Sequence, residues 1–422
     1  MRLVRKTAML AALLCAGACV DHVPSPRAGL LNSLRVVLHS PDPSMLGSPT
    51  APVDVQTATF DVFALDELGQ PVVGDFDVRL FLSFGGVKTG TVSACGDAAP
   101  DATPIEVIHL TGGQLLNHTV TLPEAFGPSA LWLDEPTTHA TGASPTIYFR
   151  NPFIADVQTP PDLTAANASF CSNFNGRYVT VDQAKTGGQL VVSSVFINAF
   201  VATDTSAGNY GAFNNMFVYS FGAPPGDIVP GRVLKDFSGN VSKFVGFTEL
   251  NFPLFDQDDQ APLATLPPPL QLAFADLSNV PKLLGAAAGV VQYTGTECNP
   301  LPPNPNHDPT IQSTDDQWLK YNGFVVDGDG TCDSFTNFAI QLPSKVLGTF
   351  DPLQNVGKTL TVVGMLRNNS GQNPELDGSG QKIACSATAP CSKGTCMAGY
   401  CFKGSFNFWT LNPRSPADVT VQ

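Results

Sequence analysis

Three aspartates in the stretch DGDGTCD could supply oxygen ligands to a metal ion. Asp327, Asp329 and Asp333 are separated by small residues, and carboxylate oxygens are the ligands that Ca²⁺ takes in proteins. The stretch lacks the glycine and the terminal glutamate of an EF-hand loop, and Asp-Gly pairs also build tight hairpin turns. The sequence therefore leaves two alternatives, a calcium site and a hairpin turn, and implies no other cofactor.

Eight cysteines beyond residue 19 could form disulfides or hold zinc. The last four lie within 17 residues, separated by five, four and four residues, whereas zinc sites usually keep a two-residue gap within each pair of ligands. We therefore favour a small disulfide knot over zinc for this group, with three local pairings open. The expected pairs, the last two being one of those three pairings, are Cys95–Cys171, Cys298–Cys332, Cys385–Cys396 and Cys391–Cys401.

The sequence contains no recognisable catalytic motif. It has no Gly-x-Ser-x-Gly elbow, and its six histidines show no His-Glu-x-x-His or other metal-binding spacing. The run VGKTL invites comparison with a phosphate-binding loop, but Pro352 stands where that loop needs glycine. We expect that the chain is not an enzyme. The alternative is a hydrolase whose site is assembled from residues far apart in the sequence.

Aromatic side chains around a loop rich in Gly and Asn are the candidate ligand-binding residues. They are Tyr210, Phe213, Phe217 and Tyr219. Faces and loops of small β-barrels commonly bind oligosaccharides or other extended polymers. The alternative is that Phe217 and Tyr219 simply pack a barrel at alternate positions of a strand.

Composition sets the fold class and excludes one class of partner. The chain has 38 glycines, 36 prolines and 28 phenylalanines, but only 14% charged residues, which favours an all-β protein of several domains. Its net charge of −14 repels phosphate backbones, so we expect no nucleic acid partner.

The stretch that begins at Leu34 predicts short, half-buried strands. Apolar and polar residues alternate in TFDVFAL and FDVRLFLSF, a pattern typical of a β-sandwich. The run FALDELGQPV resembles bacterial immunoglobulin-like domains, in which an acidic-Gly turn joins two strands. We therefore expect an Ig-like sandwich over 33–158. A linker follows over 159–174, because its adjacent prolines cannot continue a strand ladder.

A 20-residue stretch recurs about 126 residues later. GRVLKDFSGNVSKFVGFTEL, Gly231 to Leu250, returns as GKTLTVVGMLRNNSGQNPEL, Gly357 to Leu376. A duplicated five-stranded barrel would explain this, since glycines let strands bend and bulge at barrel corners. We expect Gly231 and Gly357 at equivalent strand entrances, and Leu250 and Leu376 pointing into their own barrels.

The region from 175 to 422 resembles the OB-like domains of exported bacterial proteins. GKTLTVVGML is similar to their entrance, and WTLNPRSPADV to their exit motif W-x-L-x-P-R-S-x-x-D-V, with matches at Trp409, Pro413, Arg414 and Asp418. The resemblance implies a first barrel at 175–262, a Pro-rich and helical connector at 263–287, and a second barrel at 288–422 with a Cys-rich insert at 385–401.

Residues 1–18 have the layout of a secretory signal. MRLVRKTAMLAALLCAGAC combines a basic start, a short apolar run and a small-residue exit. Its end, AGAC, resembles a bacterial lipobox, which implies that Cys19 is acylated and becomes the N-terminus; plain secretion after a cut at the same bond is the alternative. In such lipoproteins, Val20 in place of Asp implies sorting to the outer membrane. Residues 19–32 would form a flexible tether.

These features together resemble an outer-membrane lipoprotein of myxobacteria-like bacteria. The resemblance implies an exported protein that faces the periplasm or the cell surface and contacts the membrane through the lipid on Cys19. Its role would be binding or envelope structure, with a glycan or an envelope protein as partner. The alternatives are a carbohydrate- or polymer-binding module of an envelope assembly, and the hydrolase with a scattered site.

Overall fold

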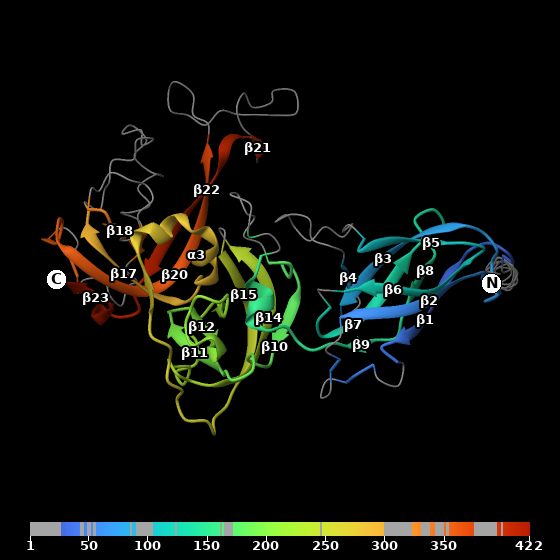
Figure 1. The fold of residues 1–422 in the computed structure, drawn as a ribbon, viewed down its shortest axis with the longest axis horizontal. Helices are drawn as coiled ribbons and strands as arrows, with labels where there is room; N and C mark the ends of the chain where they lie inside the picture. Colours follow the sequence, from blue (N-terminus) through green and yellow to red (C-terminus); the bar gives the residue numbers. More distant parts are fainter. Residues whose placement is uncertain are drawn as a thin grey trace, which may run out of the picture.

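The computed structural model consists mostly of β-strands in three sheets that follow one another along the chain (Figure 1). The all-β prediction is confirmed. The signal segment and Cys19 lie outside the described residues. The structure describes residues 27–42, 46–48, 52–53, 56–84, 87–89, 104–122, 125–160, 163, 172–244, 247–298, 323–330, 338–341, 350–351, 354–374, 395–397 and 400–422.

The first sheet has nine strands and forms a sandwich. One layer holds β1, β2 and β6, and the other holds β4, β5, β3 and β7 with β8 and β9. Strand β8 also runs parallel to β1, which joins the two layers. The strands are β1 (Ser33–Ser40), β2 (Thr57–Leu65), β3 (Phe76–Phe84), β4 (Val87–Thr89), β5 (Glu106–Leu110), β6 (Gln114–Thr121), β7 (Pro128–Asp134), β8 (Thr141–Ala143) and β9 (Ile147–Tyr148).

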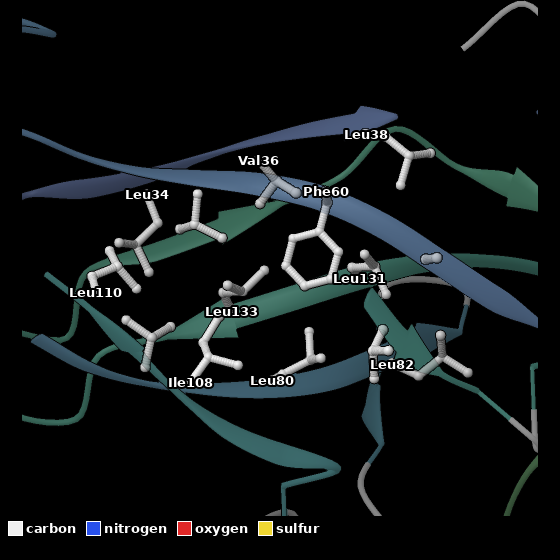
Figure 2. Packing of buried hydrophobic residues seen from close by; sticks show 14 of the residues in the cluster. Leu34, Val36, Leu38, Phe60, Leu80, Leu82, Ile108, Leu110, Leu131 and Leu133 are labelled. Carbon is white, nitrogen blue, oxygen red and sulfur yellow. The ribbon is translucent and has the colours of Figure 1, made fainter. Parts of the chain in front are cut away.

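Apolar residues from the two layers fill the sandwich. Every second residue of β2 is buried, as the alternation in TFDVFAL predicts. Figure 2 shows Val36 and Phe60 of one layer packed with Leu80 and Leu133 of the other. Leu31 already belongs to this core, so the folded part begins inside the expected tether.

The second sheet closes into the first barrel. Its order is β11-β12-β13-β15-β14, with β13 and β15 parallel, and a bridge from Val191 to Val233 joins the ends. Strand β10 extends β14. The strands are β10 (Tyr178–Val181), β11 (Leu190–Val195), β12 (Ala199–Asp204), β13 (Asn215–Tyr219), β14 (Leu234–Phe244) and β15 (Phe247–Gln257).

The third sheet closes into the second barrel. Its order is β17-β18-β19-β22-β20, with β19 and β22 parallel and with β20 pairing back to β17. Strands β16, β21 and β23 extend it. The strands are β16 (Leu270–Leu272), β17 (Val290–Glu297), β18 (Gly323–Asp327), β19 (Phe338–Gln341), β20 (Thr359–Pro374), β21 (Thr395–Met397), β22 (Tyr400–Asn412) and β23 (Val419–Val421).

The two barrels share one strand order. In each, the first strand pairs with the second and fourth, and the third pairs in parallel with the fifth. Five strands closed in this way form the OB-like barrels that the sequence predicts. The helical composition expected near 274–288 is also present, as a 3₁₀ turn (Phe274–Ser278) and helix α3 (Val280–Gly285), which packs into the second barrel's core.

Helix α2 (Ile154–Gln158) belongs to the core of the first barrel. Ile154 and Val157 are fully buried there, although the sequence pattern assigns these residues to the sandwich. Phe126 of the sandwich joins the same core, so the two units are packed together at this point. No helix in the described part of the chain has the length and apolar character needed to cross a membrane.

The predicted equivalence of the two copies is confirmed for the first half of the repeat. Gly231 and Gly357 both have left-handed φ angles, 89° and 82°. Each precedes the fourth strand of its barrel and donates its amide to the first strand, Gly231 to the Val192 carbonyl and Gly357 to the Glu297 carbonyl, both at 2.8 Å. The two glycines are therefore equivalent, as predicted.

Of the two leucines in the second half of the repeat, the structure describes Leu250 alone. Leu250 lies in β15, the fifth strand of its barrel, and is buried as predicted. Leu376 lies outside the described residues, in the stretch between β20 and β22, because β20 continues for 16 residues. Register identifies Leu411 as the true counterpart of Leu250. Val241 pairs with Leu250, and Leu366 pairs with Leu411, in the corresponding strands.

The two equivalent glycines should differ in their tolerance of a side chain. We expect Gly357→Ala to lower the free energy of unfolding by about 1 to 2 kcal/mol, which is the penalty of a left-handed backbone for a residue with a Cβ. No steric cost is added, because the new Cβ would meet no atom within 4 Å. Gly231→Ala should cost more, because its Cβ would lie 2.9 Å from the Ala264 carbonyl oxygen. Urea unfolding measures both. Gly226→Ala, in open space, is the control, and equal losses at 231 and 357 would contradict this account.

Candidate functional site

The aspartates of DGDGTCD form a turn in the residues that the structure describes. Asp327 is buried at the end of β18, and its Oδ1 accepts a hydrogen bond of 3.2 Å from the Asp329 amide. Asp333 lies outside the described residues. Among the described side chains, no three of His, Cys, Asp or Glu gather as they would around a metal ion. The choice between a calcium site and a hairpin turn therefore stays a prediction.

The four candidate aromatic residues do not form an open face together. Tyr210 is buried, which raises the pKa of its hydroxyl to about 12, and Phe217 is only 7% exposed. Two of the four candidate rings are therefore buried. Phe213 and Tyr219 are half-buried; Phe213 packs against the second barrel's core, and Tyr219 packs against the cluster between the two barrels.

A joint with the second barrel covers the outer face of β12 and β13. Ala199 and Phe217 point away from the interior of the first barrel, because they alternate with its core residues along β12 and β13. They pack instead with Ala288 and Met365 of the second barrel, and we call this cluster the joint. The Phe213 amide also donates to the Gly285 carbonyl at 2.8 Å. In OB-like barrels the face of the second and third strands is the usual ligand surface. In the first barrel that face is occupied by its neighbour.

A buried charge pair crosses the joint. Arg367 of β20 lies over the rings of Phe244 and Phe247, at 5.7 and 5.6 Å from their centroids. Burial raises the pKa of Glu249 on β15, and the nearby Arg367 opposes that shift. The joint is therefore held by aromatic packing together with partly buried charges.

The exit motif is a local structure that closes the second barrel. Asp418 accepts hydrogen bonds from the backbone amides of Arg414 and Ser415, at 2.8 and 3.0 Å, and from the Arg414 guanidinium at 3.2 and 3.0 Å. Trp409 packs in the barrel core. The motif therefore fixes the turn that returns the chain to pair β23 with β20.

A row of aromatic rings leads from the joint to the open surface. Phe217 and Phe247 are 5.4 Å apart in the joint, and Tyr219 packs at its margin. Tyr219 then contacts Phe221 edge to face at 4.5 Å, and Phe221 stacks on Phe252 at 4.7 Å. The exposed fraction of the side chain rises from 7% at Phe217 in β13 to 54% at Phe221, which follows the strand, and to 68% at Phe252 in β15.

Two members of this row were missed in the sequence. Phe221 and Phe252 have left-handed φ angles of 60° and 53°, a conformation that bulky residues rarely adopt. Phe252 lies at a bulge, where the pairing of β14 and β15 shifts between Ser238 and Asn240. Nothing in the local pattern marks these positions as exposed. The stretch LNFPLF, with a proline inside a strand, was the available signal for the bulge.

Glu297 is a buried carboxyl group at the end of β17. It is 0% exposed, and neither of its carboxylate oxygens has a hydrogen-bond partner among the residues that the structure describes. Burial raises its pKa to about 8; repulsion by Asp351 adds to the shift, and Lys358 opposes it. The equivalent position in the first barrel, defined by the glycine hydrogen bonds, is Val192, a core residue.

No model of a known protein family matches the chain, and no curated protein matches its sequence. The candidate features are therefore the aromatic row on the first barrel and the buried carboxyl group of the second.

Proposed function

We propose that the chain is an exported lipoprotein of the outer membrane that binds a component of the cell envelope and does not catalyse a reaction. The observation that carries the binding role is the aromatic row, which continues a buried joint onto an open surface. Apolar surface of this kind is costly to leave in water and usually marks an interaction site. The export signal and the lipobox-like AGAC support the location.

The location is tested at Cys19. Cys19→Ala removes the only side chain at the lipobox position, so the variant should move from the membrane pellet to the soluble fraction. One acyl-modified residue in a chain with a short apolar leader is expected to supply most of the membrane affinity. The measurement is fractionation of cells that express each form, with Cys15→Ala as the matched control. Unchanged pelleting of Cys19→Ala would rule out lipid anchoring at this residue.

We further propose that the eight cysteines beyond Cys19 pair as disulfides, in keeping with export. Cys298 is buried at the end of β17 and its sulfur is not free; Cys332 is its proposed partner. In the knot, the hairpin register pairs Cys396 with Cys401. Directly opposite residues have Cα separations that a disulfide can bridge. This register favours Cys396–Cys401 with Cys385–Cys391 over the pairing expected from the sequence.

Mass mapping of non-reduced peptides distinguishes these pairings. We expect a peptide pair that links Cys396 to Cys401 after cleavage at the intervening Met397. Detection of Cys385–Cys396 would restore the original expectation. Reduced cysteines holding one zinc ion would overturn the disulfide proposal for the knot.

A further inference from the structure

The first barrel carries an aromatic strip that is open at one end. We define the strip as Tyr219, Phe221 and Phe252. It is continuous with the inter-barrel joint through Phe217, which packs in the same cluster as Tyr219. The strip therefore extends an established interface beyond the area that the second barrel covers.

The backbone holds the strip rings outward. Phe221 follows Ser220, whose amide donates to the Asn198 carbonyl at 2.9 Å and whose hydroxyl donates to the Gly222 carbonyl at 2.6 Å. Phe252 projects from the bulge opposite Gly239, where a side chain would collide with Leu250. Rings fixed in this way lose little conformational entropy when a ligand binds, which favours affinity.

Amide and hydroxyl groups lie beside the strip, next to the buried Glu249, whose pKa is raised by burial. Asn251, the cross-strand neighbour of Tyr219, donates to the Ser242 hydroxyl at 2.7 Å, and its Oδ1 has no hydrogen-bond partner among the described residues. Asn198 and Ser220 are the neighbours of Phe221. The chain as a whole carries a charge of −14, which disfavours anionic polymers. Flat rings flanked by amide and hydroxyl groups suit the apolar faces and hydroxyl edges of neutral sugars.

The shape of the surface favours a chain over a small molecule. The cavity at the joint, lined by Phe247, Thr248 and Asn368 among others, is about the size of one water molecule. The strip instead lies on the outside of the barrel. We propose that the strip binds a neutral polysaccharide chain, laid along the rings of Phe221 and Phe252. This proposal rests on the binding role proposed above and names its ligand class.

The test uses affinity electrophoresis of the full chain in native gels that contain laminarin, barley β-glucan, glucomannan or dextran, with alginate as the anionic comparison. At least one neutral polysaccharide should retard the wild-type chain. Phe221→Asn and Phe252→Asn, chosen because Asn tolerates left-handed φ angles, should each weaken retardation at least tenfold. Leu254→Ala is the matched control, since Leu254 is 69% exposed on the same strand but outside the strip.

Three results would overturn the proposal. They are retardation by none of the neutral polysaccharides, retardation by alginate alone, and retardation that both Asn variants retain. Sedimentation of the same samples tests whether the strip instead binds a second copy of the chain. Self-association that the Asn variants abolish would show that the strip is an interface between copies. Membrane fractionation of Cys19→Ala is independent of all these outcomes, so failure of the ligand class is distinguishable from failure of the proposed location.

Discussion

Replacing Glu297 by valine is expected to stabilise the folded chain at pH 8.5 by about 2 to 4 kcal/mol. The wild-type side chain places a carboxyl group, which has no hydrogen-bond partner in the described part of the chain, inside the second barrel at the position where the first barrel has Val192. At this pH the carboxyl must either ionise in a buried site or hold a proton that the unfolded chain has released. Valine removes both costs and fills the position with a side chain that the twin barrel already accommodates.

The pH dependence follows from the two pKa values of Glu297. The carboxyl has a pKa of about 8 in the folded chain, against 4.5 for the ordinary group. Between these values the unfolded chain binds fewer protons, so the free energy of unfolding falls as pH rises, by at most about 1.4 kcal/mol per pH unit. The penalty is absent below pH 4.5 and complete above about pH 8. The benefit of Glu297→Val should therefore be small at pH 4.5.

Urea unfolding of wild type and Glu297→Val across this pH range measures the effect. Lys358→Gln is an informative companion, because Lys358 lowers the pKa of Glu297. Its loss should raise that pKa further and extend the fall in stability to higher pH. A stability difference between wild type and Glu297→Val that does not change from pH 4.5 to 8.5 would mean that Glu297 does not titrate as a buried group.

The sequence carried enough information to predict the barrels and their starting points. The alternation of apolar and polar residues and the glycines between strands indicated where the strands lie. The matched glycines at 231 and 357 indicated where each fourth strand begins. The inward position of Glu297 was also readable, because it continues the phase of Val291 and Tyr293 along β17.

Tertiary packing explains what the sequence could not show. Phe217 alternates correctly as an outward residue of β13, and only the second barrel buries it. The fifth strand of the second barrel lies beyond the repeated stretch, because β20 and β22 form a long hairpin that moves this strand further along the sequence. Local patterns record strand phase. They do not record which outward face a neighbouring unit covers or how long a hairpin grows.

The joint predicts that the two barrels unfold as one unit. Leu250 is fully buried in the first barrel, so Leu250→Ala should cost about 2 to 5 kcal/mol. The first barrel buries Phe217 and Phe247 against Ala288 and Met365 of the second, and separating them would expose this cluster. Loss of the first barrel therefore withdraws the packing on which the second depends, and the second should unfold at the same denaturant concentration.

Tryptophan fluorescence separates the units. Trp132 lies in β7 of the sandwich, and Trp409 lies in β22 of the second barrel. A variant that keeps only one of these tryptophans, with the others changed to Phe, therefore reports on the unfolding of one unit. Leu250→Ala should lower the urea midpoint read by Trp409, although the two residues belong to different barrels, whereas Leu254→Ala on the exposed side of β15 should leave it unchanged. A Trp409 midpoint that stays constant in Leu250→Ala would show that the barrels unfold independently and that the joint contributes little to their stability.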